Sequence, residues 1–198
     1  MKQLLTSLAL LALVPVGVAL ADTPDDILFD VYRNGSPFGE HTVRFQETEN
    51  GALQVDVDVE LWAGLGPITL FRYRHDSREV WDDGELVSVT ADTFNDGTEM
   101  DFSLEGDAIP PLTLSSHWRG YQAGLDQVFN TETGEPMDVV IEDLGEEMFE
   151  TPDGPVPARH LRIIGTLTAD LWYDENGRWI GCAFEARGQE IRYVLRDS

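Results

Sequence analysis

Apolar and polar residues alternate along most of the chain, as expected for strands with one buried and one solvent-facing side. The stretch ALQVDVDVEL shows the pattern most clearly, because every second residue from Leu53 to Leu61 is Leu or Val and the residues between them are polar. Asn-Gly or Asp-Gly pairs such as Asn34-Gly35 and Asp96-Gly97 separate alternating stretches, and these pairs favour tight hairpin turns. The pattern therefore predicts an antiparallel meander.

The alternation predicts about ten to twelve strands. Their expected ranges are 27–33, 38–48, 52–62, 67–82, 85–95, 98–105, 137–143, 146–151, 156–165, 167–174, 178–187 and 189–196. A flat sheet of this size curls, splits or closes. We therefore expect an all-β fold, either a single antiparallel β-barrel or a rolled, barrel-like meander, with a two-sheet sandwich as the alternative. The chain has no strand–helix–strand rhythm, so a parallel α/β sheet is not expected.

Residues 109–135 interrupt the alternation. We expect one long loop here, or a short helix capped by Ser115 or Ser116 and running to Leu125. Loops of this length often serve as lids, plugs or binding loops.

The N-terminus has the features of a cleaved secretory signal peptide. Lys2 precedes an apolar run from Leu4 to Leu13, and Ala19-Leu20-Ala21 forms a small-residue cleavage site. We expect a signal peptide over residues 1–21, a single β domain over 22–198 and a periplasmic location. No later apolar run reaches the roughly 20 residues that a membrane-spanning helix needs.

The chain is strongly acidic, with 37 Asp and Glu against 13 Lys and Arg and a net charge of −24. This charge argues against nucleic-acid partners and favours solubility. Cys182 is the only cysteine, so no intrachain disulfide can form. No neighbour in sequence would activate its thiol, and we expect a buried, inert side chain.

Several stretches carry a family resemblance. They are LWYDENGRW followed by FEARGQEIRYVL, VYRNGSPFGEHTVRF, YRHDSREVWDDGELVSVTADTFNDG, SSHW and FNTETG. Together they resemble an uncharacterised family of secreted bacterial β-proteins, a domain of unknown function with a C-terminal LWYD..GRW signature. The resemblance covers nearly all of the chain after the signal peptide. It implies a periplasmic, barrel-like or rolled β domain, and it implies no activity and no catalytic residues.

Closed β-barrels often hold a small ligand inside, and aromatic residues make good sites for apolar ligands. By this analogy we expect a non-enzymatic protein without a cofactor that binds a lipid-like, apolar or amphiphilic molecule. Tyr73, His75 and His41 would supply interior polar contacts, and Trp118, Tyr121 and the 109–135 segment would cover the mouth. The remaining candidate ligand residues are Glu79 and Arg74.

The inward-facing parity of residues 71–80 stays open at this point, because a register shift of one residue exchanges the two sets of side chains. In the C-terminal stretch, alternation predicts an apolar face of Ile180, Cys182, Phe184 and Ala186, with Trp179 on the opposite face.

Two alternatives remain. His41, His75, Glu79 and His160 offer nitrogen and oxygen ligands for a metal or groups for acid–base catalysis, although the sequence has no local ligand spacing such as HxH or HExxH. The acidic surface suits an interaction module of an envelope complex. Ser115, Ser116 and His117 adjoin in sequence, but neighbouring strand residues point apart, so they form no catalytic dyad by themselves.

Overall fold

The computed structural model describes residues 23–65 and 68–196. Its elements are β1 (Ile27–Arg33), β2 (Ser36–Glu47), β3 (Leu53–Leu65), β4 (Ile68–Asp82), β5 (Glu85–Asn95), β6 (Thr98–Glu105), the 3-10 turn η1 (Gly106–Ala108), β7 (Gln127–Asn130), β8 (Glu135–Asp138), β9 (Val140–Thr151), β10 (Gly154–Ile164), β11 (Thr168–Tyr173), β12 (Trp179–Ala186) and β13 (Gln189–Leu195). The N-terminal residues expected to form the signal peptide lie outside the described residues.

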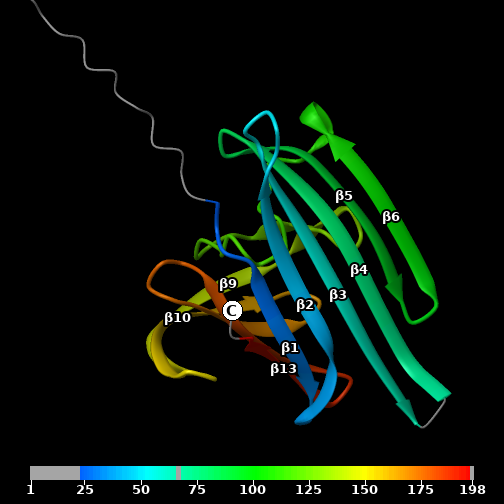
Figure 1. Ribbon diagram of the computed structural model, residues 1–198, viewed down its shortest axis with the longest axis vertical. Helices are drawn as coiled ribbons and strands as arrows, with labels where there is room; N and C mark the ends of the chain where they lie inside the picture. The colour runs from blue at the N-terminus through cyan, green and yellow to red at the C-terminus, as the bar shows by residue number, and fades with distance from the viewer. Residues whose placement is uncertain (1–22, 66–67, 197–198) are drawn as a thin grey trace, which may run out of the picture.

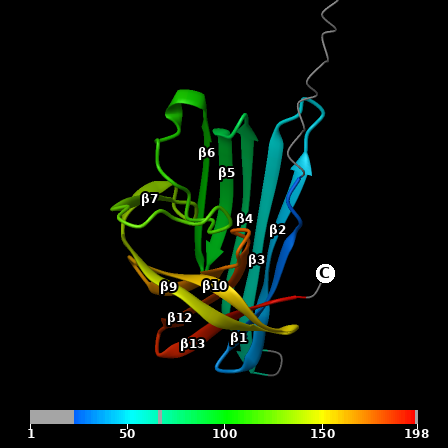
Figure 2. The same cartoon turned by 90° about the vertical axis from the view of Figure 1, so that its left-hand side faces the viewer.

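Eleven antiparallel strands form one sheet in the order β6-β5-β4-β3-β2-β1-β13-β12-β11-β10-β9. The first and last strands of the chain pair with each other, since β1 hydrogen-bonds to β13. The strands β2–β6 stand upright as one half, and β9–β13 curl across the same side of the sheet as the other half (Figures 1 and 2). The expected all-β fold is confirmed as a rolled, barrel-like meander whose edges are β6 and β9, rather than a closed barrel.

β-Bulges help the second half to curl, because a bulge bends a strand and increases its twist. The pairing shifts between His160 and Leu161 where β10 meets β9, and between Trp172 and Tyr173 where β11 meets β12. A third shift lies between Val31 and Tyr32, opposite the start of β2.

The main core lies between the two halves of the roll. Fully buried side chains from both halves meet there, including Phe29, Val55, Leu161, Leu171 and Trp179. The outer face of the upright half instead carries charged pairs such as Arg78 with Asp56. This division matches the alternation of apolar and polar residues along the strands.

The predicted faces of the C-terminal stretch are partly wrong. Trp179 and Cys182 both belong to the main core, and Ile180 lies in a separate cluster with Phe149 and Ala158. The bulge opposite β11 adds a residue between Trp179 and Cys182, so the alternation changes phase there. Cys182 is buried as expected, and burial raises the pKa of its thiol well above the usual value.

The segment 109–135 contains no helix and holds the short strand β7, which pairs with β8. It runs along the concave side of the roll (Figure 2). Its backbone is fixed in part by hydrogen bonds to itself, since Ser115 N donates to Phe129 O at 2.9 Å and Phe129 N donates to Thr113 O at 2.8 Å. Leu114, Tyr121 and Phe129 of the segment are buried, whereas residues 122–124 and Asp126 are exposed. Among the described residues, no helix is long and apolar enough to cross a membrane.

Candidate ligand cavity

The strand β4 carries an unusual row of polar residues on its inward face. Tyr73, His75, Ser77 and Glu79 alternate with charged residues, and His75, Ser77 and Glu79 are almost completely buried. The outward set includes Arg74, which contacts Asp76 and Asp92 at 2.9 Å each. The register of the sheet thus settles which parity of the 71–80 stretch faces inward.

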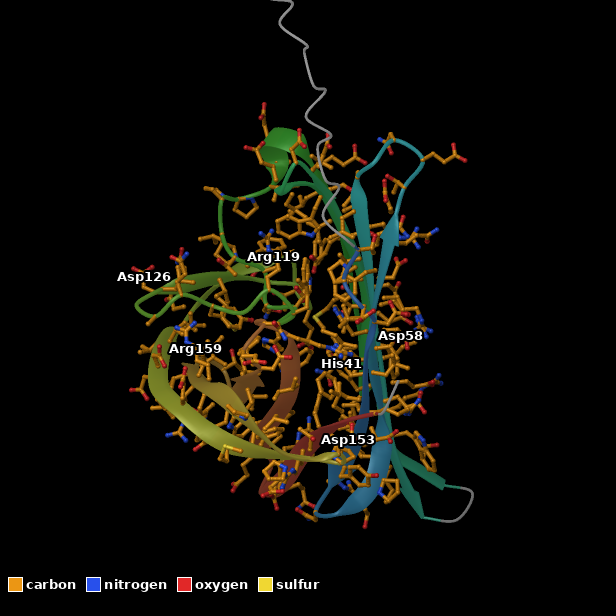
Figure 3. All side chains as sticks on the ribbon, turned by 60° about the vertical axis from the view of Figure 1, so that its left-hand side comes forward. His41, Asp58, Arg119, Asp126, Asp153 and Arg159 are labelled. Atoms are coloured by element: carbon orange, nitrogen blue, oxygen red, sulfur yellow. The ribbon has the colours of Figure 1, made fainter. Side chains whose placement is uncertain are left out.

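Strand pairing brings His41 and His75 into one transverse row. His41 of β2 pairs with Val59 of β3, which pairs with His75 of β4, which pairs with Thr93 of β5. Neighbouring strands lie about 4.8 Å apart, so the two histidine backbones are separated by about two strand spacings on the same face. Figure 3 shows His41 directed into the space between the two halves of the roll, while Asp58 points to the other side of the sheet.

His117, from the 109–135 segment, is the third histidine of this region. Its φ of 67° is in the left-handed region that non-glycine residues seldom adopt. Its ring lies 5.3 Å from that of Trp179, and its Nδ1 lies 2.6 Å from the Tyr121 hydroxyl. Tyr173 donates a hydrogen bond to the His117 carbonyl at 2.9 Å. The sequence pattern does not indicate His117 as a site residue, because only the tertiary structure brings the loop against Trp179 of β12.

These histidines line a cavity of about 790 Å³, which we call the histidine cavity. This volume lies within the range of about 300–1,000 Å³ typical of small-molecule sites. Its wall is mostly apolar. Apolar and aromatic lining residues include Phe38, Val57, Val59, Leu61, Phe71, Met137, Ile163, Ala169, Cys182, Phe184, Ile191 and Tyr193.

His41 has no hydrogen-bond partner on either ring nitrogen. Its ring is surrounded by those of Phe29, Trp179 and Tyr193, with centroids 5.1 to 6.3 Å away. Burial, followed by the nearby His117 and His75, lowers the pKa of His41 to about 3. A buried polar group without a partner is costly, so this unpaired imidazole is suited to a polar atom of a bound molecule.

The other two histidines are also neutral at physiological pH. Burial lowers the pKa of His75 to about 4, against the smaller opposing effect of Asp76, and lowers the pKa of His117 to about 4. His75 Nδ1 lies 2.8 Å from the Thr93 hydroxyl. The cavity therefore offers neutral imidazoles that can exchange hydrogen bonds with uncharged polar groups.

Glu79 lies beyond Ser77 on the same inward face and is fully buried. Its Oε2 accepts hydrogen bonds from the indoles of Trp81 at 2.8 Å and Trp118 at 3.0 Å, while Oε1 has no partner. Burial raises the pKa of Glu79, and hydrogen bonds and the charge of Arg119 oppose that shift. Glu79 thus anchors the 109–135 segment to β4 rather than lining the histidine cavity.

A second cavity of about 910 Å³ lies on the other side of this anchored segment. Ser115, Ser116 and His117 line the histidine cavity, whereas Arg119, Gly120 and Tyr121 line the second one. Residues 115–121 therefore form a partition between the two spaces. Arg119 lies over the Trp81 ring at 4.1 Å, and the wall also includes charged residues such as Glu146 and Arg159.

The structure brings together only part of the expected ligand site. Tyr73, His75 and His41 line the histidine cavity. Trp118 and Tyr121 do not cover its mouth, because they pack inside the roll around Glu79 and His117. Arg74 lies on the outer face with its side chain 45% exposed, so it is not part of the cavity.

The four residues considered as metal ligands do not assemble. His160 hydrogen-bonds Asp170 at 2.9 Å and stacks on Trp172, whose side chain belongs to the separate Phe149 cluster. His41 and His75 face the interior instead. Within residues 23–65 and 68–196, no group of three or more His, Cys, Asp or Glu side chains is placed to hold a metal ion.

Replacing His41 with Leu should stabilise the empty protein, because it removes two buried ring nitrogens that have no partner. We expect a gain of about 1–3 kcal/mol in the free energy of unfolding at pH 7.5, measured by chemical denaturation. His41→Gln keeps a polar group at the site and should give no comparable gain. A loss of stability in His41→Leu would show that the imidazole already has a partner.

Comparisons with known proteins agree with the fold. A search of solved structures finds the crystal structure of a beta-barrel-like protein of domain of unknown function DUF1849 from Brucella abortus, with a TM-score of 0.55 and 8% sequence identity. The alignment covers 87% of this chain and 95% of that chain. At such low identity the likeness shows the fold alone. No curated protein matches the sequence.

The resemblance noticed in the sequence is confirmed at the level of the family. The family model described as "Domain of unknown function (DUF6134)" matches residues 29–196, from Phe29 within β1 to the residue after β13. The match includes every strand that lines the histidine cavity. The chain belongs to this family, DUF6134, a domain of unknown function.

Proposed function

We propose that this protein is a periplasmic binding protein for an apolar or amphiphilic small molecule, which it holds in the histidine cavity. The observation that carries the proposal is a cavity of about 790 Å³, lined mainly by apolar side chains, into which the buried His41 points without a hydrogen-bond partner. Apolar walls with a few placed polar groups are typical of small-molecule sites.

The cost of an empty cavity to the stability of the fold also favours a bound ligand. A large apolar cavity lowers stability, because its lining atoms lose packing contacts. An unpaired buried imidazole adds a further cost. A molecule with an apolar body and a hydrogen-bonding group would offset both costs.

Native mass spectrometry tests the proposal directly. The protein would be purified from the periplasm of its own host without added lipid or chelator. A non-covalent mass increment of lipid size, lost on denaturation, is the expected result. A metal-sized increment would favour the metal protein, and a bare mass together with a stably bound basic protein would favour the interaction module. Either of these results would overturn the proposal.

A cavity-filling variant locates the site. Ala169→Phe places a benzyl group into the histidine cavity, because Ala169 lines it and is 9% exposed. We expect the lipid-sized increment to fall at least about tenfold in abundance, since the added ring occupies the ligand volume. Ala183→Phe is the matched control, because Ala183 pairs with Arg192 and Asp170 on the outer face. Equal retention in both variants would exclude the histidine cavity.

A further inference from the structure

The mouth of the histidine cavity has a distinct chemistry. Phe38 and Phe71 stack there with centroids 5.7 Å apart. The guanidinium of Arg33 lies 5.3 Å from the centre of the Phe38 ring, and that of Arg187 lies 5.8 Å from the centre of the Phe71 ring. All four residues line the cavity. Two guanidinium groups therefore flank an aromatic pair where the apolar interior meets solvent.

Arg187 lies in a hairpin turn with a positive φ, a backbone conformation that arginine seldom adopts. Among the described residues, four two-residue hairpin turns have both residues at positive φ, namely Asn34-Gly35, Asp83-Gly84, Asp96-Gly97 and Arg187-Gly188. Asn, Asp and Gly are favoured in such turns, and other residues there are strained. Only at the cavity mouth does arginine take the first position, with a φ of 53°. Strained residues of this kind concentrate at functional sites.

The two arginines also make few polar contacts with other described residues. No salt bridge of Arg33 occurs within the described part of the chain, and Arg187 contacts Asp96 at 3.6 Å, longer than a normal hydrogen bond. Its side chain remains 76% exposed. The nearby carboxylate of Glu132 accepts a hydrogen bond from the Asn95 amide at 2.9 Å. In a chain of net charge −24, a cavity mouth with two arginines whose one ion pair among the described residues is the 3.6 Å contact of Arg187 with Asp96 calls for an explanation.

We propose that the ligand of the histidine cavity is an amphiphile with an oxyanion headgroup, a carboxylate or a phosphate, which Arg33 and Arg187 hold at the mouth. This inference rests on the proposed function and names the class of ligand. One guanidinium group can donate two parallel hydrogen bonds to two oxygens of a carboxylate or a phosphate. The apolar body then lies between the Phe38–Phe71 pair and the strands β3, β11 and β12, which contribute Val59, Ala169 and Phe184 to the wall. A second hydrogen-bonding atom, deeper in the ligand, would meet the unpaired imidazole of His41.

A headgroup series tests the inference. The mature protein would be titrated below the micellar concentration with four twelve-carbon probes: dodecanoate, dodecyl phosphate, dodecanol and dodecylammonium. Displacement of an environment-sensitive fluorescent probe gives each Kd. We expect at least one anionic probe to bind about tenfold or more tightly than dodecanol, and dodecylammonium to bind more weakly than dodecanol. The tighter of the two anions identifies the headgroup as carboxylate or phosphate.

Variants of Arg33 and Arg187 test whether these residues cause the preference for anionic headgroups. Arg187→Asn introduces a residue that suits the turn, so a loss of binding cannot be ascribed to a weakened fold. We expect Arg187→Asn and Arg33→Gln each to reduce anion affinity about tenfold while leaving dodecanol affinity unchanged. Arg192→Asn, on the exposed outer face of β13, is the matched control and should leave all four affinities unchanged.

The outcomes separate this inference from the proposed function. If dodecanol binds as tightly as both anions, or if the mouth variants retain the anion preference, the headgroup inference is overturned while amphiphile binding stands. If none of the probes binds, the inference falls together with the proposed function.

Discussion

Acidification from pH 6.5 towards pH 4.5 should destabilise the protein by several kcal/mol. His41, His75 and His117 have folded-state pKa values of about 3, 4 and 4, below the ordinary value of 6.5. In this window the unfolded chain binds protons at all three histidines and the folded chain does not, so stability falls as the pH falls. Each histidine contributes a slope of about 1.36 kcal/mol per pH unit, and the three together about 4.

Glu79 acts in the opposite direction. Burial raises its pKa, so the folded protein binds this proton at a higher pH than the unfolded chain does. Its stabilising contribution is present at low pH and is lost as the pH rises through the folded pKa. Glu79 therefore reduces the slope set by the histidines at pH values between its unfolded and folded pKa values.

Urea denaturation at several pH values between 7.5 and 4.5 measures this slope. Native domains are stabilised by only about 5–15 kcal/mol, so we expect the empty protein to approach unfolding near the acidic end of the series. His75→Gln should lower the slope by about 1.36 kcal/mol per pH unit, since it removes one titrating group. A free energy of unfolding that stays constant between pH 6.5 and 5 would show that the histidines are not buried in neutral form.

The substitution Gly39→Ala should reduce the free energy of unfolding by about 3 kcal/mol or more. A Cβ atom at residue 39 would lie 1.9 Å from the backbone oxygen of Glu60 and 2.9 Å from the Cα atom of Leu61. Both are main-chain atoms of β3, so no side-chain rotation relieves the clash. β2 would have to move away from β3 two residues before His41, which would also disturb the cavity.

Gly35→Ala is the matched control. Gly35 also has a positive φ, of 74°, but a Cβ atom there would meet nothing within 4 Å. Only the backbone preference then opposes the substitution, at a cost of about 1 kcal/mol. Thermal and chemical denaturation of the two variants separates the steric effect from the conformational one. Equal losses in both variants would contradict the close approach of β2 and β3.

Gly39 illustrates a limit of sequence reasoning. The stretch NGSPFG contains several turn-forming residues, and the predicted strand began at residue 38. In the structure the turn consists of Asn34-Gly35 alone, β2 begins at Ser36, and Gly39 lies within the strand beside a shift in pairing. A glycine needed for a turn and a glycine needed for close strand approach look identical in a sequence, because only the partner strand distinguishes them.

The sequence by itself determined the class of fold and most of the strands, because period-two alternation reports directly which side chains are buried. It also indicated the family and the buried Cys182, and it named Tyr73, His75 and His41 as polar residues of the interior. It did not reveal His117, the partition formed by residues 115–121 or the outward position of Arg74. Nor did it reveal the phase change that places Trp179 in the main core and Ile180 in the separate cluster with Phe149. These features depend on strand register, on bulges and on a loop folding back into the roll. Such relations join residues that are distant in sequence, so no local pattern encodes them.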